Sequence, residues 1–200
     1  MSPRKVNKEE KRREVALACS DLIHEVGMKK ITVAQVAKTA GIGKGTVYEY
    51  FDNKDDIIFE IINIHIEQYL DGFKESIKTV KNTKDKIRHF FKFVLDDSED
   101  NIKHFNGYKE FLSIVLADEN SAMKEFNCDT HDFFKNQLSE ILEEGVKIGD
   151  LKPESIDLAE SLLIFEKGLV LMKMSQNDHQ VQEKFEHFLN TLFKLIEIKK

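Results

Sequence analysis

Hydrophobic residues recur at helical spacing along almost the whole chain. The first stripe repeats every three or four positions over residues 15–26 and stops at Gly27. A second stripe begins after Asn53 and continues over residues 58–77. This period is typical of amphipathic helices, and the alternation expected of strands is absent. The pattern therefore predicts an all-α fold.

Five further stripes fill the rest of the chain. They predict helices near residues 87–95, 108–116, 123–142, 154–175 and 179–198, with polar breaks near Asn82, 96–100 and Asn120. The helix at 154–175 carries two neighbouring apolar rows: Leu158, Leu162, Phe165, Leu169 and Met172, then Ala159, Leu163, Val170 and Met174. A helix that is apolar over so much of its circumference is buried on more than one side. It therefore lies in the middle of a domain or meets a partner chain.

One segment carries particularly clear local signals. Thr32 suits a helix N-cap at the start of a capping box, and Gly41 fits the left-handed residue that ends a helix. Gly43 can begin a second short helix, in which Val47 and Phe51 point inward. Two short helices joined by a tight glycine turn describe a helix-turn-helix, whose second helix enters the DNA major groove.

The second of these short helices leaves polar and aromatic groups on its outer side. Lys44, Thr46, Tyr48 and Tyr50 can hydrogen-bond to phosphates and base edges. The alternative is an ordinary helical hairpin, since caps and glycine turns are common. The exposed Tyr-x-Tyr pair beside Lys44 favours DNA binding.

Charge is distributed unevenly along the chain. The whole protein carries a net charge of −6, yet residues 1–55 hold 11 Lys and Arg against 8 Asp and Glu. Residues 56–200 hold 19 and 28. A basic N-terminal part on an acidic body favours contact between that part and phosphate. Residues 1–13 are expected to form a flexible basic arm, which touches the DNA backbone or only solubilises the chain.

Residues 13–57 closely resemble the DNA-binding domain of TetR-family transcriptional regulators. The matching positions are 15–18, Gly27, 31–33, 36–37, 40–42, 44–48, 50–51 and 53–55. The resemblance implies a homodimer in which residues 1–55 form a three-helix helix-turn-helix domain. Residues 56–200 would form a helical ligand-binding and dimerisation domain, and the last two helices of each subunit would meet in a four-helix interface.

The resemblance also implies a function and a set of DNA contacts. The chain is expected to be a transcriptional repressor that a small, largely apolar effector releases from a palindromic operator. Thr32 and Lys54 would contact phosphate, and Lys44 would reach a guanine edge. Many family members carry a hydroxyl where this chain has Gly43, so only its backbone N–H can serve there. The expected DNA-binding residues are Thr32, Gly43, Lys44, Gly45, Thr46, Tyr48, Tyr50 and Lys54.

Phenylalanine is concentrated in the predicted second domain. Twelve of the 15 phenylalanines lie between Phe90 and Phe193. Spacing alone favours an ordinary aromatic core, whereas the resemblance favours an effector pocket. Glu110 and Glu166 lie beside apolar stripes, where they would meet a polar group of a ligand, be solvated or pair with lysine. The candidate lining residues are Phe90, Phe91, Phe111, Phe134, Phe165 and Met172.

Other classes of site find little support in the sequence. Cys128 and His131 have no second pair at matching distance, so no metal site or cofactor is expected. His65, on an apolar stripe, is predicted to be a hydrogen-bonded core histidine. No ordered catalytic set stands out, which argues against an enzyme. Cys19 is expected to be a small core residue in a reducing, cytoplasmic environment. The alternative function is a helix-turn-helix architectural or partner-binding protein without an effector.

Overall fold

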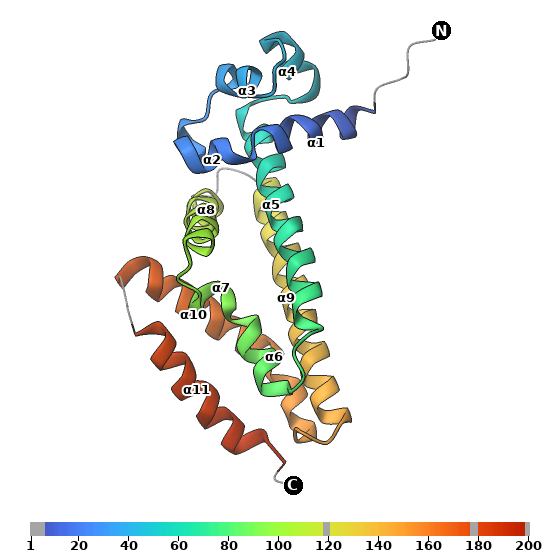
Figure 1. Ribbon diagram of the computed structural model, residues 1–200, viewed down its shortest axis with the longest axis vertical. Helices are drawn as coiled ribbons and strands as arrows, with labels where there is room; N and C mark the ends of the chain where they lie inside the picture. Colours follow the sequence, from blue (N-terminus) through green and yellow to red (C-terminus); the bar gives the residue numbers. More distant parts are fainter. Residues whose placement is uncertain (1–6, 118–120, 177–179, 199–200) are drawn as a thin grey trace. The chain divides into compact units, whose positions relative to one another are not determined.

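The chain folds as helices, as the hydrophobic period predicts (Figure 1). The computed structural model describes residues 7–117, 121–176 and 180–198, and no strand occurs within these ranges. The helices are α1 (Lys8–Ala18), α2 (Ser20–Val26), α3 (Val33–Thr39), α4 (Lys44–Tyr50), α5 (Lys54–Ile77), α6 (Thr83–Phe90), α7 (Lys92–Leu95), α8 (Glu99–Leu116), α9 (Ser121–Lys147), α10 (Ala159–Gln176) and α11 (Val181–Ile196), with 3-10 helices η1 (Met28–Lys30) and η2 (Pro153–Leu158). The predicted all-α fold is confirmed.

The chain divides into two compact units. The first, which we call the head, comprises residues 1–73 and 106–116. The second, which we call the body, comprises residues 74–105 and 117–200. Two helices, α5 and α8, each contribute residues to both units.

The head is built around a small apolar core. In it α3 packs on α4, and α1 packs on α2 and α4. Val47 and Phe51 are buried, as predicted for the inner side of α4. Cys19 is also fully buried, and its thiol lies 3.7 Å from the Val36 carbonyl oxygen. His65 is half-buried, and its Nε2 lies 3.2 Å from the carbonyl oxygen of Ser20, which confirms the hydrogen bond predicted for this histidine.

Two expectations for the N-terminal region are wrong in part. The apolar stripe over residues 15–26 forms two helices, because the backbone leaves the helix at Cys19 (φ −102°, ψ 6°) while its side chain enters the core. Residues 8–13 are the first turns of α1 and not a flexible arm. The Asn7 side chain begins this helix by accepting a hydrogen bond of 3.2 Å from the Glu9 amide. Residues 1–6 of the expected arm lie outside the described residues.

The body is organised around α9. This helix packs against α6, η2 and α10, and α11 packs against α6, α7 and α10. The helix predicted over 87–95 forms two, because the chain turns at Phe91 between α6 and α7. Gly145 allows α6 to approach α9 closely, since a Cβ there would stand 2.7 Å from Thr83 Cγ2. The amide of Lys152 donates to the Ile196 carbonyl at 2.9 Å and ties the end of α11 to the turn before η2.

The apolar surface of α10 is distributed differently from the prediction. Members of both predicted rows, among them Leu162 and Leu163, are buried within the same chain. The apolar residues left exposed form a third stripe, in which Ile164 is 60% and Leu171 is 65% exposed. No described helix is both long enough and apolar enough to cross a lipid bilayer.

Candidate DNA interface and effector region

The turn between α3 and α4 has the geometry that its sequence predicts. The Thr32 hydroxyl accepts a hydrogen bond from the Gln35 amide at 3.3 Å, and Gln35 Oε1 accepts from the Thr32 amide at 2.9 Å. Gly41 has φ +67°, which is the left-handed region. The Ile42 amide then donates to the Ala37 carbonyl at 3.0 Å. This is the Schellman motif, which fixes the direction in which α4 leaves α3.

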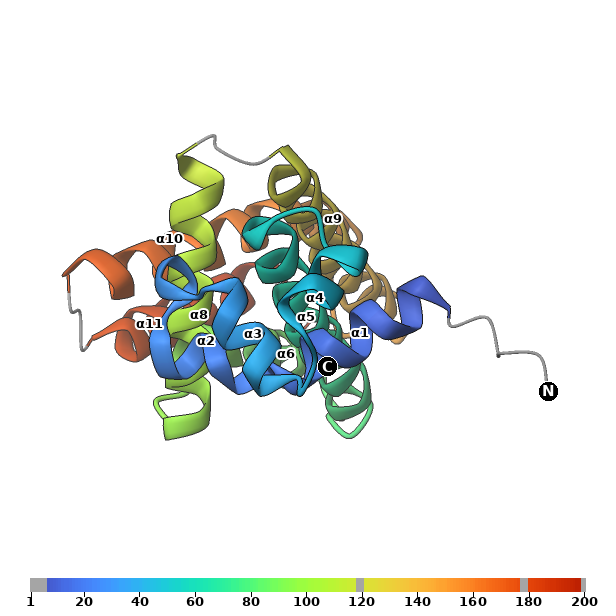
Figure 2. The same cartoon turned by 90° about the horizontal axis from the view of Figure 1, so that it is seen from above.

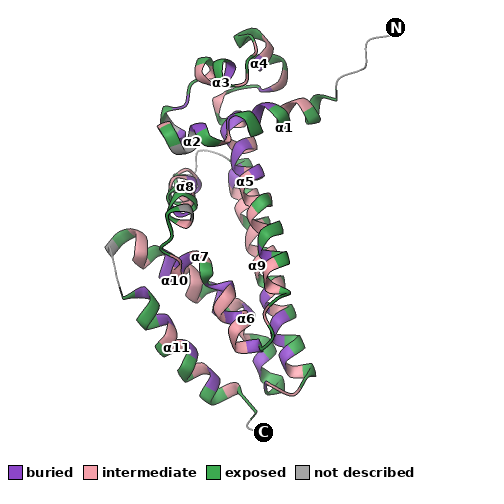
Figure 3. Cartoon of the chain, in the orientation of Figure 1, coloured by how far each residue is buried: buried purple, intermediate pink, exposed green. Residues whose placement is uncertain are grey.

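The outer side of α4 is formed by residues from its start and its middle. In the view from above, α3 and α4 lie next to each other (Figure 2). Several exposed residues lie on α4 (Figure 3). They include Lys44, Gly45 and Tyr48, and Tyr48 is 52% exposed. Thr46 and Tyr50 are half-buried, so they lie at the edge of this exposed side and not at its centre.

The remaining predicted contacts lie at helix ends. Thr32 and Gly43 are the N-caps of α3 and α4, and both are exposed. Gly43 makes no side-chain cap bond, and a Cβ at Gly45 would meet nothing within 4 Å. Lys54 is half-buried in the first turn of α5. The eight predicted residues are thus the N-caps of α3 and α4, five residues of α4 and the first residue of α5, and none is fully buried.

Glu49 is a member of this surface that the sequence interpretation left out. It follows Tyr48 and is exposed, next to the three exposed residues near the start of α4. Its position in a seven-residue helix could have been read from the helical period, because residues 45 and 49 share one side. The exposed side of α4 therefore carries one carboxylate beside the Lys44 ammonium.

Arg12 of α1 connects the end of α4 to the start of α5. Its Nη1 donates to the Tyr50 carbonyl oxygen at 2.7 Å and to Asp56 Oδ2 at 2.9 Å. Its Nη2 donates to Asp56 Oδ1 at 2.7 Å and to Glu60 Oε2 at 3.2 Å. The guanidinium also lies 4.7 Å from the centroid of the Phe51 ring. These hydrogen bonds lower the pKa of Asp56, so the pair stays ionised at neutral pH.

Basic side chains of α1 form ion pairs within the head. Arg13 pairs with Glu67 of α5 at 2.7 Å, and Lys11 pairs with Glu14. The head also contains residues 56–73, which follow the basic segment 1–55. These residues carry four carboxylates and no Lys or Arg. Residues 106–116 add one Lys and one Glu, so the head as a whole has a formal net charge of −1. Its attraction for DNA must depend on where the lysines are placed.

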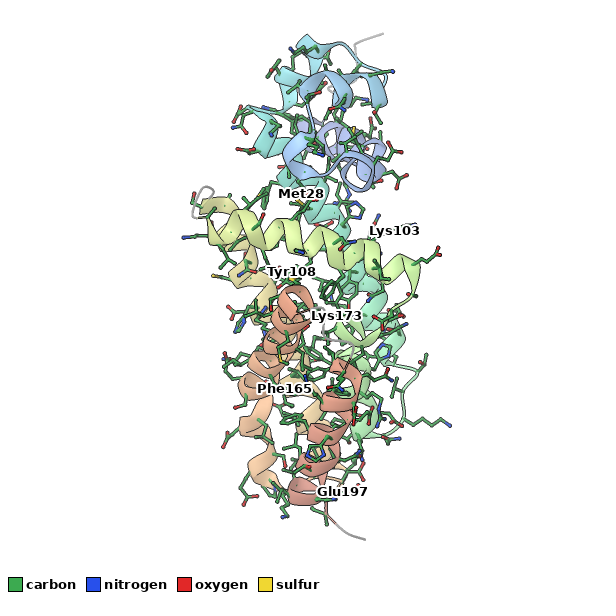
Figure 4. All side chains as sticks on the ribbon, turned by 90° about the vertical axis from the view of Figure 1, so that its left-hand side faces the viewer. Met28, Lys103, Tyr108, Phe165, Lys173 and Glu197 are labelled. Atoms are coloured by element: carbon green, nitrogen blue, oxygen red, sulfur yellow. The ribbon has the colours of Figure 1, made fainter. Side chains whose placement is uncertain are left out.

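Four of the predicted effector residues form a continuous aromatic cluster in the body. The Phe90 ring lies 5.6 Å from the Phe134 ring and 5.7 Å from Phe91, and Phe91 lies 6.0 Å from Phe165. The labelled Phe165 side chain extends from α10 (Figure 4). Phe111 belongs instead to the head, where its ring stacks with Tyr108 at 6.2 Å. Met172 is half-buried on α10.

Glu166 is the unusual polar residue of this region. It lies on the inner side of α10, one turn from the buried Leu162 and Leu163 and one turn from the buried Leu169 and Val170. Burial raises the pKa of its carboxyl to about 7. No hydrogen bond or ion pair joins it to another described residue. The expected pairing with lysine is therefore not found among the described residues, whereas solvent contact of this half-buried side chain stays a prediction.

The polar residues near Cys128 make separate contacts. Cys128 is exposed, and His131 Nε2 lies 3.3 Å from Glu160 Oε1. Within the described ranges, no three side chains of the metal-binding types come together.

The raised pKa of Glu166 predicts a specific pH dependence of stability. The folded chain keeps a proton that the unfolded chain releases between pH 4.5 and about 7, so stability falls as the pH rises through this window. Glu166→Gln should remove this loss and raise the free energy of unfolding at pH 8 by about 2–3 kcal/mol. Denaturation curves at pH 5 and pH 8 test this. The exposed Glu183→Gln is the control, and equal curves for wild type and Glu166→Gln would contradict the assignment.

Comparison with known proteins agrees with this geometry. Residues 18–61 match the model of the bacterial regulatory proteins of the tetR family. The chain is 28% identical over 150 residues to the fatty acid metabolism regulator protein of Bacillus subtilis, which covers 70% of each protein.

Two solved structures share the fold. A TetR-family transcriptional regulator from Cytophaga hutchinsonii matches with a TM-score of 0.78 at 14% identity, over 98% of this chain and all of that one. The regulator FadR of Bacillus subtilis in complex with stearoyl-CoA matches with a TM-score of 0.57 at 24% identity, over 91% and 95%. Residues 18–61, with their capped helix-turn-helix, thus match the DNA-binding domain of the tetR family, and the chain as a whole has the fold of TetR-family transcriptional regulators.

Proposed function

We propose that the protein is a cytoplasmic, homodimeric repressor that a small, largely apolar effector releases from a palindromic operator. The observation that carries the proposal is the exposed side of α4, which follows a fixed turn and presents Lys44, Gly45 and Tyr48 to solvent. A short helix of this kind fits the major groove, and two symmetric copies read two half-sites.

The roles of the DNA-binding residues follow from their positions. Lys44, in the first turn of α4, is suited to the acceptor atoms of a guanine. Thr32 and Lys54, at the starts of α3 and α5, are suited to phosphate oxygens on either side of the groove. The Thr32 hydroxyl donates its one hydrogen to Gln35 Oε1 at 2.8 Å, so a contact with phosphate would require this hydrogen to turn from Gln35 to the phosphate oxygen. Gly45 has no side chain, which permits close approach of the backbone.

The effector would bind in the body, beside the aromatic cluster. The rings of Phe90, Phe91, Phe134 and Phe165 supply an apolar surface, and Met172 on α10 can adapt to different shapes. We keep Phe111 as a candidate, although it belongs to the head. The stearoyl-CoA bound to the Bacillus subtilis regulator supports a ligand with a long apolar part.

The dimer would form through the outer side of α10 together with α11. Ile164 and Leu171 are seven residues apart, so they share one side of α10, and the exposed Gly168 lies between them. A Cβ at Gly168 would meet nothing within 4 Å in the same chain. Exposed Leu195 extends the apolar surface on α11. An exposed apolar stripe beside a fully packed inner face is typical of a surface covered by a partner.

The two lysines should affect DNA binding in different ways. Lys54→Ala should weaken binding to every duplex and reduce the salt dependence by about one unit, because it removes one phosphate contact. Lys44→Ala should relax the preference at one base pair, at a cost of roughly 1–3 kcal/mol. Duplexes selected from a random pool give the operator, and titrations at several salt concentrations give the affinities. The exposed Lys81→Ala, which removes the same charge from the body, is the control. If both variants bound the selected operator as wild type does, the contacts would be assigned wrongly.

Stearoyl-CoA serves as the first effector probe. A ligand that binds the operator-free state should raise the melting temperature and weaken operator binding by the same linkage. We expect both effects of stearoyl-CoA in wild type. Coenzyme A without an acyl chain should produce neither effect, because the acyl chain supplies the apolar contacts. Operator binding that no long-chain ligand changes would favour the alternative of an architectural or partner-binding protein.

The dimer surface can be tested with one charge. Leu171→Glu should yield monomers at micromolar concentration and weaken operator binding at least about tenfold, because a buried unpaired carboxylate opposes association. Sedimentation analysis measures the oligomeric state. Leu116→Glu is the matched control, since Leu116 is 80% exposed on α8, and it should remain dimeric. Dimers of normal affinity in Leu171→Glu would place the interface elsewhere.

A further inference from the structure

A carboxylate from α8 binds the backbone at the start of η1 in the head. Glu110 Oε2 accepts a hydrogen bond of 2.6 Å from the amide of Met28. Met28 is only 3% exposed, and it is labelled beside α8 in Figure 4. The contact joins residues 82 positions apart within the head.

The residue before Met28 explains why a distant carboxylate is needed there. Gly27 is the N-cap of η1, has φ +80°, and offers no side chain to satisfy the first amides of the helix. Glu110 supplies the missing acceptor from another element, and a charged acceptor is stronger than a neutral one. A Cβ at Gly27 would stand 3.2 Å from Glu110 Oε1, so the carboxylate occupies the space that a side chain would need.

The hydrogen bond fixes the entry to the helix-turn-helix. From Met28 the chain passes through η1 and the buried Ile31 to Thr32, the N-cap of α3. Because α3 packs directly on α4, a shift of η1 changes the position from which both helices begin. Glu110 therefore helps to fix, within the head, where α3 and α4 are held relative to residues 106–116 of α8.

The same helix is anchored in the body at its other end. Asn101 Nδ2 donates to the Phe93 carbonyl at 2.8 Å and to the Asp96 carbonyl at 2.6 Å. Lys173 of α10 lies 5.1 Å from the centroid of the Phe105 ring and donates to Asp97 at 2.8 Å. The start of α8 is thus tied to the α7–α8 connection and to α10, the helix that also carries the buried Glu166.

We propose that Glu110 is a positioning residue that couples the body to the helix-turn-helix through its hydrogen bond with the Met28 amide. The inference rests on the proposed function of operator binding. A change at the start of α8 shifts Glu110 along a continuous helix, and the bound amide follows it. Since coupling is reciprocal, operator binding at the head must in turn change the start of α8.

Amide hydrogen exchange of the full-length protein, with and without the selected operator duplex, tests the coupling. In wild type we expect the operator to change exchange over residues 93–105, and in Glu110→Ala, at saturating operator, this change should fall to less than about half. In the free protein, the Met28 amide should exchange roughly tenfold faster in Glu110→Ala. Glu110→Gln, whose amide oxygen can still accept, should restore part of both effects.

The control is Asp71→Asn, which removes one exposed carboxylate from the same unit and should behave as wild type. A wild-type protein that binds no duplex would overturn the proposed function, and the coupling with it. If wild type binds the operator but shows no change over residues 93–105, the coupling alone is overturned. The coupling is also overturned if Glu110→Ala keeps the full operator-induced change in exchange over residues 93–105. It is likewise overturned if Asp71→Asn loses as much of this change as Glu110→Ala does.

Discussion

The Arg12 guanidinium is the interaction on which the DNA-reading part of the molecule depends. It holds the last carbonyl of α4 and the first-turn carboxylate of α5 in one set of hydrogen bonds, and it covers the Phe51 ring between them. A recognition helix of seven residues has too few internal hydrogen bonds to be stable alone. Its geometry is therefore imposed from outside, by the turn at Gly41 on one end and by Arg12 on the other. Removing the guanidinium would leave Asp56 and Glu60 without their partner in a half-buried position.

The body combines a tightly packed aromatic cluster with a carboxyl that has little solvation. The Phe91 ring lies 6.0 Å from the Phe165 ring and 4.6 Å from the Phe185 ring, so the burial of Phe91 needs no ligand to explain it. Glu166 is different, because burial of its carboxyl without a partner costs stability at neutral pH. Residues that cost stability and serve no packing purpose are often retained for function. Glu166 therefore adds a titratable carboxyl to a body whose packing is otherwise largely apolar.

The features that the sequence could predict are those whose partners lie within one turn. The capping box of Thr32 and the left-handed Gly41 involve hydrogen bonds between near neighbours, and the Asn53 side chain accepts from the Asp56 amide at 2.9 Å. Their residue types are specific to those geometries, so they could be identified without a structure. The periodic stripes gave the helices for the same reason, although tertiary contacts divided two of them.

The interactions that the sequence could not predict join distant residues. Arg12 looks like part of a DNA-binding arm, and only the fold brings it to Asp56, 44 residues away. From the sequence, Glu110 is expected to face solvent or a ligand. In the structure it accepts a hydrogen bond from a backbone amide 82 positions before it. A backbone group has no signature in a sequence pattern, and a surface lysine or arginine is compatible with many carboxylates. Side-chain exposure on α4 was partly predictable, but the edge positions of Thr46 and Tyr50 depend on how α4 packs against its neighbours.

The exposed carboxylate of Glu49 has a consequence for how such a protein searches a genome. Where this carboxylate lies next to DNA phosphates, the like charges repel and oppose binding. Arg12 and Arg13 are paired with carboxylates of the head, so they contribute less to non-specific attraction for DNA. Weak attachment to random sites leaves more copies available for the correct one, because competing sites outnumber it by many orders of magnitude. A carboxylate at this position is also suited to accept a hydrogen bond from a cytosine amino group. This arrangement lowers the rate of association with DNA and also shortens the residence time at non-specific sites.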